Sequence, residues 1–302
     1  MAAAVDNSNT ELSQQYDTPL GLAHSTMQAL KDRIKLHYDL ASDYYLSLWG
    51  EHIHHGYWED GSETKEQAQV KLIQLLLKIS NVGENSKVLD VGCGIGGTSR
   101  YLASTLGCSV TGITISTKQV EIANRLTKAE ALKDSEKPDV EADGDGFFHL
   151  GRGKVRFIEL DAEKMGEFFA PEGGSFDAVW ISEALSHFPN KSLFFENTFK
   201  VLKAGGKLAL ADWFKAEDIS GTDFANDIKP IEGGRAFLSG GSKRYQQGRE
   251  QDLNPSLWAF AFSQGRDGIA FLQSFRAMRR GYANGTFQYA VMSFEKLEKN
   301  IN

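Results

Sequence analysis

The stretch KVLDVGCGIGGTSRYLA, Lys87 to Ala103, joins an apolar segment to a glycine-rich turn and then to a helical segment. Val88, Leu89 and Val91 predict a strand that is buried on both faces, as the strands of parallel sheets are. Glycines let the backbone turn sharply and approach a ligand where a Cβ would collide, and the following helix offers free N–H groups. The glycines of the turn are Gly92, Gly94, Gly96 and Gly97. The stretch therefore predicts an α/β fold with a cofactor on this turn.

Further apolar segments follow along the chain, with helical stretches between them. This alternation predicts a doubly wound, mostly parallel sheet flanked by helices. The strands are expected at Lys87–Val91, Ser109–Thr114, Val155–Leu160, Phe176–Ile181 and Lys207–Ala211.

Local signals predict a helix before the first strand and turns between elements. The segment from Glu63 to Ser80 has apolar residues at helical spacing, which predicts an amphipathic helix packed on the sheet. Asn85 and Ser86 supply the turn before the first strand, and Ala204 to Gly206 supply the turn before the fifth. The apolar residues of the expected helix are Leu72, Leu75, Leu76 and Ile79.

Composition limits the class of protein. A chain of 302 residues, 41% of them hydrophobic, can bury one full core with an accessory cap. One domain over residues 21–302 is expected, after a polar, flexible arm of residues 1–20. The net charge of -7 and the absence of a basic block argue against nucleic acid and favour a small-molecule substrate. Cys93 and Cys108 are too few for a disulfide framework.

The sequence shows no targeting or membrane signal. Its N-terminus lacks a positive start followed by an apolar core, and no apolar run of about 18 residues occurs. We therefore expect a cytoplasmic protein without an integral membrane segment. The oligomeric state does not follow from the sequence.

Two classes of cofactor fit the glycine turn. Gly92, Gly94 and Gly97 satisfy the dinucleotide fingerprint GxGxxG, which is a weak signal alone. That fingerprint requires an acidic residue at the end of the second strand, where this chain has Thr114 to Ser116. Asp90 suits the cationic sulfonium and ammonium of S-adenosylmethionine (SAM) better than it suits a pyrophosphate. The residues favour SAM over a nicotinamide cofactor, and a turn without a ligand is the remaining alternative.

Three segments of the chain resemble a known family. The segments VLDVGCGIGG at 88–97, GITIS at 112–116 and HYDLASDYYLSLWGEHIHHGYW at 37–58 are similar to class I SAM-dependent methyltransferases. Within that class, the chain resembles the branch of gamma-tocopherol, sterol and small-molecule N-methyltransferases. The resemblance covers Ile34 to Trp213 and the C-terminal helix and strand. It implies a helical cap over residues 34–80 and a last strand, starting at Phe287, that is antiparallel beside the fifth.

Two segments break the expected pattern. Asp134 to Gly153 is charged and glycine-rich, which predicts an extended surface loop. Glu232 to Leu253 lacks the apolar sixth strand that the resemblance implies, so six strands are expected, the last of them an exposed edge. Part of a substrate cap would then be missing, which makes a non-catalytic SAM-binding protein the alternative to an enzyme.

The cofactor residues are expected at the carboxyl ends of the strands, where open parallel sheets bind ligands. Asp161 is expected to accept from the adenine amine, unless it only caps a helix. By resemblance, Thr114, Ile115 and Gln119 lie around the ribose, and residues 54–56 close over the methionine carboxylate. No metal is expected, because the adjacent histidines have no Cys, Asp or Glu at metal spacing. The full set is Asp90, Gly92, Cys93, Gly94, Gly96, Thr114, Ile115, Gln119, Asp161, Ala162, Ser182, His54, His55 and Gly56.

The segment WISEALSHF, Trp180 to Phe188, is the expected catalytic segment. Glu183 and His187 are four residues apart, so one helical turn would point both toward the methyl acceptor. His187 is the expected general base or substrate hydrogen-bond partner, because the ordinary pKa of histidine lies near physiological pH. Glu183 would attract a cationic amine or orient the histidine; the alternative is a helix-capping glutamate and a packed histidine. Related enzymes have an acid where this chain has Ser186, and cyclopropane-forming relatives bind bicarbonate with it, so cyclopropane synthesis is disfavoured.

Aromatic residues predict the substrate class. Methyl transfer from SAM, which leaves S-adenosylhomocysteine, mainly requires alignment and exclusion of water, and orientation alone supplies about 7–11 kcal/mol. The aromatic residues predict a lipophilic lid and hence an apolar or aromatic acceptor, of the sterol, prenyl-quinol or alkaloid type. Nitrogen, carbon and oxygen acceptors all stay open. The expected substrate-binding residues are Tyr44, Tyr45, Trp49, Trp213 and Trp258.

Overall fold

The computed structural model describes residues 27–133, 138–188, 190–229, 238–239 and 276–297. The predicted arm, residues 1–20, and all but two residues of the 232–253 segment lie outside them. The chain divides into two compact units, one of residues 31–213 and 289–302 and a second of residues 1–30 and 214–288. The candidate site described below lies within the first unit.

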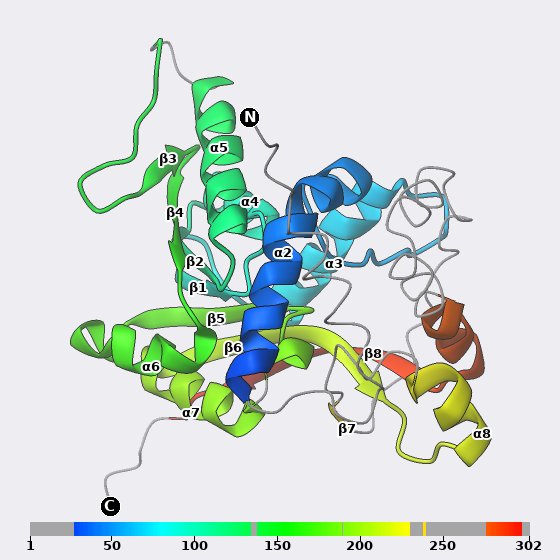
Figure 1. The fold of residues 1–302 in the computed structure, drawn as a ribbon. Coiled ribbons are helices and arrows are strands. Elements are labelled where there is room, and N and C mark those ends of the chain that lie inside the picture. Colours follow the sequence, from blue (N-terminus) through cyan, green and yellow to red (C-terminus); the bar gives the residue numbers. More distant parts are fainter. Residues whose placement is uncertain (1–26, 134–137, 189, 230–237, 240–275, 298–302) are drawn as a thin grey trace, which may run out of the picture. The chain divides into compact units, whose positions relative to one another are not determined.

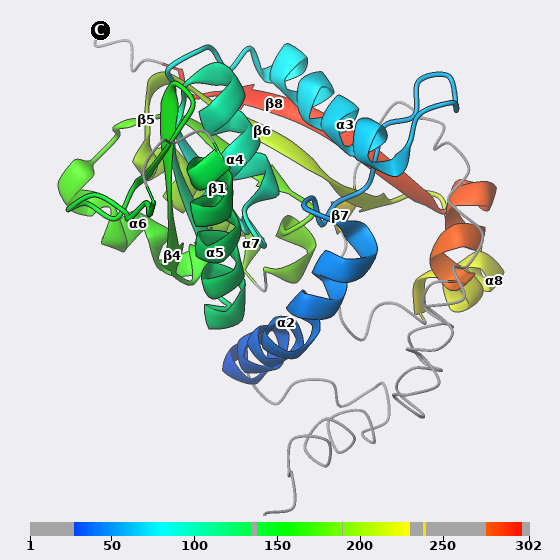
Figure 2. The ribbon, with the colours of Figure 1, turned by 90° about the horizontal axis from the view of Figure 1, so that it is seen from above.

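Within the described residues, eight strands form one sheet in the order β3-β4-β2-β1-β5-β6-β7, and β8 pairs with β6 (Figures 1 and 2). Neighbours from β4 to β6 are parallel, whereas β3 is antiparallel to β4. Gly205 donates to the carbonyl of Lys296 and Ala216 to that of Thr286, so β8 runs antiparallel to β6. The strands are β1 Lys87–Val91, β2 Ser109–Thr114, β3 Phe148–Leu150, β4 Gly153–Glu159, β5 Phe176–Ser182, β6 Leu202–Lys215, β7 Leu238–Ser239 and β8 Phe287–Glu295. The predicted doubly wound, mostly parallel sheet is confirmed.

Helices cover both faces of the sheet. Figure 1 shows α4 and α5 on one side and α6 and α7 on the other. The α-helices are α2 Met27–Trp49, α3 Lys65–Ser80, α4 Gly97–Leu106, α5 Thr117–Lys133, α6 Met165–Phe168, α7 Lys191–Val201 and α8 Gly221–Asp223. Short 3-10 turns are η1 Ala162–Lys164, η2 Ala170–Glu172 and η3 Leu185–His187, and η4 Phe224–Ile228 is a π-helix.

The sheet is the core of the first unit. Val88, Leu89 and Val91 of β1 are fully buried, as their position between two parallel neighbours requires. The helix α3 begins at a capping box, in which Thr64 accepts from the Gln67 amide and the Gln67 side chain accepts from Thr64.

Three local expectations are wrong. Leu72 and Leu76 of α3 are buried as expected, but Ile79 is exposed, and Ile73 is the further apolar residue that α3 buries. The expected turn at Ala204 to Gly206 lies inside β6, which therefore starts five residues early. The expected loop from Asp134 to Gly153 contains β3, because Phe148 and Leu150 bury their side chains beside β4.

The number of strands also differs from the expected six. Besides β3, the structure has β7, which lies within the Glu232–Leu253 segment where no strand is expected. Its two residues pair in parallel with Phe214 and Lys215 of β6. A strand of two residues has too few side chains to produce an alternating or apolar pattern in the sequence.

The second unit has its own small core. Ile228, Ala277 and Phe287 pack together there. The carboxylate of Asp227 is fully buried and accepts from the side chains of Arg280 and Thr286. A buried carboxylate needs such partners, so Asp227 joins η4 to residues 280–286.

Candidate active site

Two adjoining clefts lie at the carboxyl ends of the parallel strands. The larger is bordered by α2, the ends of β2, β4 and β5, and η3, and the smaller by residues 51–54 and the start of α4. They share four lining residues, Ile53, Gly92, Gly94 and Ser182. The two clefts therefore meet at the glycine turn.

The glycine turn fits tightly against its neighbours on one side only. Gly92 has a φ of +73°, and a Cβ on it would lie 2.3 Å from the Cβ of Ala184. A Cβ on Gly97 would lie 2.1 Å from the backbone oxygen of Glu51. A Cβ on Gly94 would meet nothing within 4 Å, because it would point into the clefts. The turn thus needs glycine for close backbone packing and leaves one face open to a ligand.

The smaller cleft contains a buried carboxylate and a buried neutral imidazole. Asp90 is 3% exposed and accepts from Ser99 Oγ at 2.6 Å, and burial raises its pKa to about 6. His54 is buried and lines the same cleft, and burial lowers its pKa. Its Nε2 has no hydrogen-bond partner among the described residues. A buried acceptor or donor without a partner is costly unless a ligand supplies one.

Glu183 lies at a sharp turn after β5, not on a helix. Its φ of +57° is left-handed, an uncommon conformation for a residue with a side chain. Its Oε1 accepts from the His55 amide at 2.7 Å and from Tyr289 Oη at 2.9 Å, and its Oε2 contacts His55 Nδ1 at 2.7 Å. Burial raises its pKa, but the contacts with His55 outweigh burial and bring it to about 2.

The predicted pairing of Glu183 with His187 on one helical turn is therefore wrong. β5 ends at Ser182, and η3 starts only at Leu185, so the two side chains leave the backbone at different points. Glu183 contacts His55, whereas His187 Nε2 contacts Tyr38 Oη of α2 at 3.0 Å. Both residues still line the larger cleft.

The turn that carries His187 is held by a buried carboxylate on the next strand. Asp212 of β6 is 1% exposed and accepts from the amides of Leu185 at 2.8 Å and Ser186 at 3.3 Å. These two amides belong to the start of η3, so Asp212 caps the turn from a neighbouring strand. No local pattern of residues predicts this cap.

The ends of β2 and β4 bring the expected ribose and adenine residues to the larger cleft. Thr114 donates to the Gln119 side chain at 2.6 Å, and Ile115 lines the cleft beside them. Asp161 caps η1 through the amide of Glu163 and also accepts from Lys31 Nζ at 2.7 Å. Asp161 therefore caps a helical turn and also lines the larger cleft, so its expected contact with adenine stays a prediction.

Several expected residues do not reach either cleft. A Cβ on Gly96 would meet the Phe157 ring and one on Gly56 would meet Ala68 and Trp58, so both glycines serve packing. Trp213 is 2% exposed and packs edge-on against His55. Tyr45 and Trp49 pack against each other on α2, and Tyr45 bonds His37. The Tyr44 side chain and Trp258 lie outside the described residues.

The structure adds residues that sequence analysis missed. Lys31, Ile34 and Tyr38 of α2 line the larger cleft, as do Ile53 and Phe188. Tyr38 lies within the aromatic segment of residues 34–58, but nothing in its spacing distinguishes it from its neighbours. No group of His, Cys, Asp and Glu side chains suited to a metal ion occurs in the described part of the chain.

Comparisons with known proteins agree with this fold. The family model of mycolic acid cyclopropane synthetases matches residues 24–143, and that of methyltransferase domains matches residues 89–210. Together with the sheet order, these matches show that the chain is similar to class I SAM-dependent methyltransferases. The resemblance inferred from the sequence is thereby confirmed.

Individual relatives are small-molecule methyltransferases. Tocopherol O-methyltransferase of Arabidopsis thaliana is 32% identical over 63% of this chain and 52% of its own length. The 2-methyl-6-phytyl-1,4-hydroquinone methyltransferase of Synechocystis sp. is 37% identical over 56% of this chain and 47% of its own length. This chain thus spans about half the length of these relatives.

A solved structure shares the fold. Geranyl diphosphate C-methyltransferase from Streptomyces coelicolor A3(2), in complex with S-adenosyl-L-homocysteine, has a TM-score of 0.59 and 16% identity. The match covers 89% of this chain and 98% of that one.

Replacing Glu183 by glutamine is expected to destabilise the protein at neutral pH. The pKa of Glu183 lies near 2 in the folded protein, below its ordinary value of 4.5. The charged carboxylate therefore contributes on the order of 3 kcal/mol above about pH 4.5, and the contribution disappears as pH falls through about 2. Urea denaturation of both proteins should show a large difference at pH 6 that shrinks toward pH 3. Tyr289→Phe, which removes one hydrogen bond, should cost only about 1 kcal/mol. A pH-independent difference would contradict the charged state.

Proposed function

We propose that the protein transfers the methyl group of SAM to a nitrogen, carbon or oxygen atom of an apolar or aromatic small molecule. The observation that carries this proposal is the pair of adjoining clefts. Asp90 lies in one and the Tyr38–His187 pair in the other, and the glycine turn connects them. The methionine half of a cationic donor could thus occupy the smaller cleft, while its adenosine half and the methyl acceptor occupy different parts of the larger one.

The residues present fit SAM. Asp90 is a buried carboxylate whose charge a cation would stabilise, and the His54 Nε2 in the same cleft needs a polar partner. Gly94 leaves the face of the turn open. We assign the methionine half to these residues, the ribose to Thr114, Ile115 and Gln119, and the adenine to Asp161 and Ala162. When bound, SAM supplies a methyl group that is activated by its sulfonium, because S-adenosylhomocysteine is an excellent leaving group.

The chain's own residues then align the acceptor and take its proton. Tyr38, Ile53 and Phe188 line the larger cleft, so they exclude water and orient an apolar acceptor there. When an N–H or O–H acceptor is methylated, its proton passes to His187 Nε2, directly or through the Tyr38 hydroxyl that contacts this nitrogen. His187 is the catalytic residue in this proposal.

Glu183 has a different role from the one its sequence position suggests. Both of its oxygens are engaged by His55 and Tyr289, and its pKa of about 2 makes it a poor base. We assign it to holding residues 54–56 against the turn after β5. Its charge, at the wall of the larger cleft, would also favour a cationic acceptor.

The substrate class is supported by the lining and by the relatives. Ile34, Ile53, Leu160 and Phe188 give the larger cleft apolar walls. The two relatives above are named for tocopherol and for a phytyl hydroquinone, both apolar ring compounds. Neither the nicotinamide oxidoreductase nor the non-catalytic alternative is favoured by these relatives.

The structure bears on the location of the protein only through its helices. None of the described helices combines the length and the apolar character needed to cross a membrane. Residence in the cytoplasm and a place in secondary metabolism stay predictions from the sequence.

Calorimetry and isotope transfer test the proposed function. We expect titration with SAM and with S-adenosylhomocysteine to give saturable binding, and NADH and NADPH to give none. Incubation with a cell extract and methyl-labelled SAM should then place label in an apolar small molecule, which mass spectrometry identifies. Binding of NADH in place of SAM would refute the assignment, and SAM binding without any labelled product would favour a non-catalytic SAM-binding protein.

A further inference from the structure

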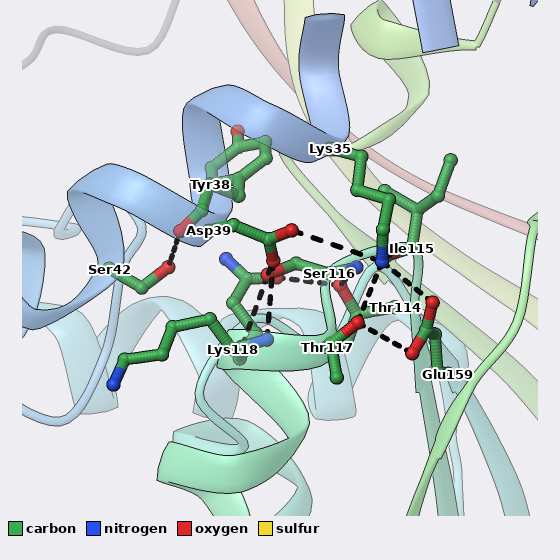
Figure 3. A network of polar contacts seen from close by, with 11 residues as sticks. Lys35, Tyr38, Asp39, Ser42, Thr114, Ile115, Ser116, Thr117, Lys118 and Glu159 are labelled. Carbon is green, nitrogen blue, oxygen red and sulfur yellow. Dashed lines mark hydrogen bonds and ion pairs between the residues drawn. The ribbon is translucent and has the colours of Figure 1, made fainter. Parts of the chain in front are cut away.

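One face of α2 is attached to the turn that follows β2 (Figure 3). Lys35 Nζ donates to the carbonyl of Ile115 at 3.0 Å, to Thr117 Oγ1 at 2.7 Å and to Glu159 Oε1 at 2.6 Å. Asp39 Oδ1 accepts from Ser116 Oγ at 2.6 Å and from the Lys118 amide at 3.2 Å. Lys35 and Asp39 are four residues apart on α2, so both side chains leave the same side of the helix. We refer to their contacts with residues 115–118 and Glu159 as the clamp.

Asp39 completes the N-terminal cap of a helix to which it does not belong. α5 begins at Thr117, and the first amides of a helix lack partners within it. Ser116 Oγ accepts from the Gln119 amide at 3.1 Å, and Asp39 accepts from the Lys118 amide and from the Ser116 hydroxyl. A carboxylate at this end of a helix also interacts favourably with the helix dipole. The cap therefore fixes α2 at a defined position on α5.

The clamp lies between two parts of the candidate site. Thr114 and Gln119, immediately before and after the clamped turn, line the larger cleft and bond each other. Tyr38 lies next to Asp39 on α2 and contacts His187, which is 149 residues away in the sequence. The rotation of α2 about its axis decides where the Tyr38 hydroxyl lies, and the clamp fixes that rotation.

We propose that Lys35 and Asp39 are positioning residues that hold the Tyr38 hydroxyl on His187 by fastening α2 to the turn after β2. The inference rests on the proposed function, because it acts through the Tyr38–His187 pair. Neither residue lines the cleft, so both act through Tyr38 and not on a ligand.

The imidazole ¹⁵N spectrum of His187 tests the clamp without any substrate. The chain has seven histidines, and the His187 signals are assigned by their loss in His187→Gln. Tyr38→Phe removes the hydroxyl and should shift the Nε2 signal. Asp39→Asn should produce the same shift, because the hydroxyl leaves its place when α2 is released. The matched control is Asp43→Asn, one turn along α2, which removes only exposed ion pairs, with Lys118 Nζ at 3.1 Å and with Arg125 at 3.7 Å, and should leave the spectrum unchanged.

Turnover gives a second readout once the labelled product is known. We expect kcat of Asp39→Asn to fall at least about tenfold, with unchanged KM for the acceptor, and kcat of Asp43→Asn to stay at the wild-type value. If Asp39→Asn does not fold because α5 loses part of its cap, Lys35→Met releases the other half of the clamp and leaves that cap intact.

The outcomes separate the clamp from the proposed function. An Asp39→Asn or Lys35→Met protein with the wild-type His187 spectrum overturns the clamp, as does an equal shift in Asp43→Asn. If the His187 Nε2 signal does not shift in Tyr38→Phe, both the clamp and the Tyr38–His187 pair are overturned. If Tyr38→Phe and Asp39→Asn shift the His187 signal as expected but the wild-type protein binds no SAM in calorimetry, the proposed function is refuted and the clamp is not.

Discussion

Replacing His187 by alanine is expected to lower kcat by about 10²–10⁴-fold, the usual contribution of a positioned general base. His187 Nε2 faces Tyr38 Oη at 3.0 Å and lines the larger cleft, so it is placed to receive the acceptor's proton. Turnover is measured as transfer of label from methyl-labelled SAM to the product that the extract experiment identifies. Tyr38→Phe should give a smaller loss, because the imidazole keeps its place.

The affinity for SAM is the control for this experiment. His187 lies on η3 and is not among the residues assigned to SAM, which are in the smaller cleft and at the ends of β2 and β4, so His187→Ala should bind SAM as tightly as the wild type in calorimetry. A variant with full turnover would show that His187 only packs in the protein. A parallel loss of SAM affinity would mean that the substitution disturbs the cofactor site and not the proton transfer.

Replacing Asp90 by asparagine is expected to weaken SAM binding by about 10–100-fold, the worth of a hydrogen bond to a charged group. Burial raises the pKa of Asp90 to about 6 in the ligand-free protein, so the carboxyl group is largely ionised at pH 7 and largely protonated at pH 5. Because only the ionised form attracts a cation, SAM affinity should fall about tenfold between these pH values. Calorimetric titrations at several pH values measure both effects.

Three comparisons sharpen the Asp90 experiment. Asp90→Asn should remove the pH dependence of SAM binding, because no titrating group remains at that position. S-adenosylhomocysteine lacks the sulfonium charge, so an equal loss of affinity for both ligands would assign Asp90 to the ammonium. Asp177→Asn is the matched control, since Asp177 bonds the Lys87 amide at the opposite end of β1. SAM binding that is insensitive to both pH and Asp90→Asn would contradict the assignment.

Much of the fold was predictable because its signals are local. The Lys87–Val91 strand and the glycine turn after it are decided by residues adjacent in sequence, and both are observed as expected. Ser109–Thr114 matches the observed β2 as well. The short strands β3 and β7 were missed, because segments of two or three residues carry no periodic pattern.

The candidate site was less predictable, because its contacts join distant segments. Asp90 and Gly94 were found from the turn itself, but Tyr38 was not distinguished from Tyr45 and Trp49, which share its helix. Only the rotation of α2 on the protein decides that Tyr38 meets His187 while Tyr45 meets His37.

The sequence by itself determined the class of fold, the glycine turn and the SAM-like character of its ligand. The spacing of apolar residues, the glycines of the turn and the nearby carboxylate of Asp90 are all features of residues that are close together in the chain. Tertiary structure alone decided which side chains meet. It separated Glu183 from His187 at a left-handed turn, paired them with His55 and Tyr38, and brought Asp39 and Asp212 to caps on elements far away in the sequence. Such pairings depend on how helices and strands pack, and a buried charge or free amide takes whichever partner that packing brings within reach.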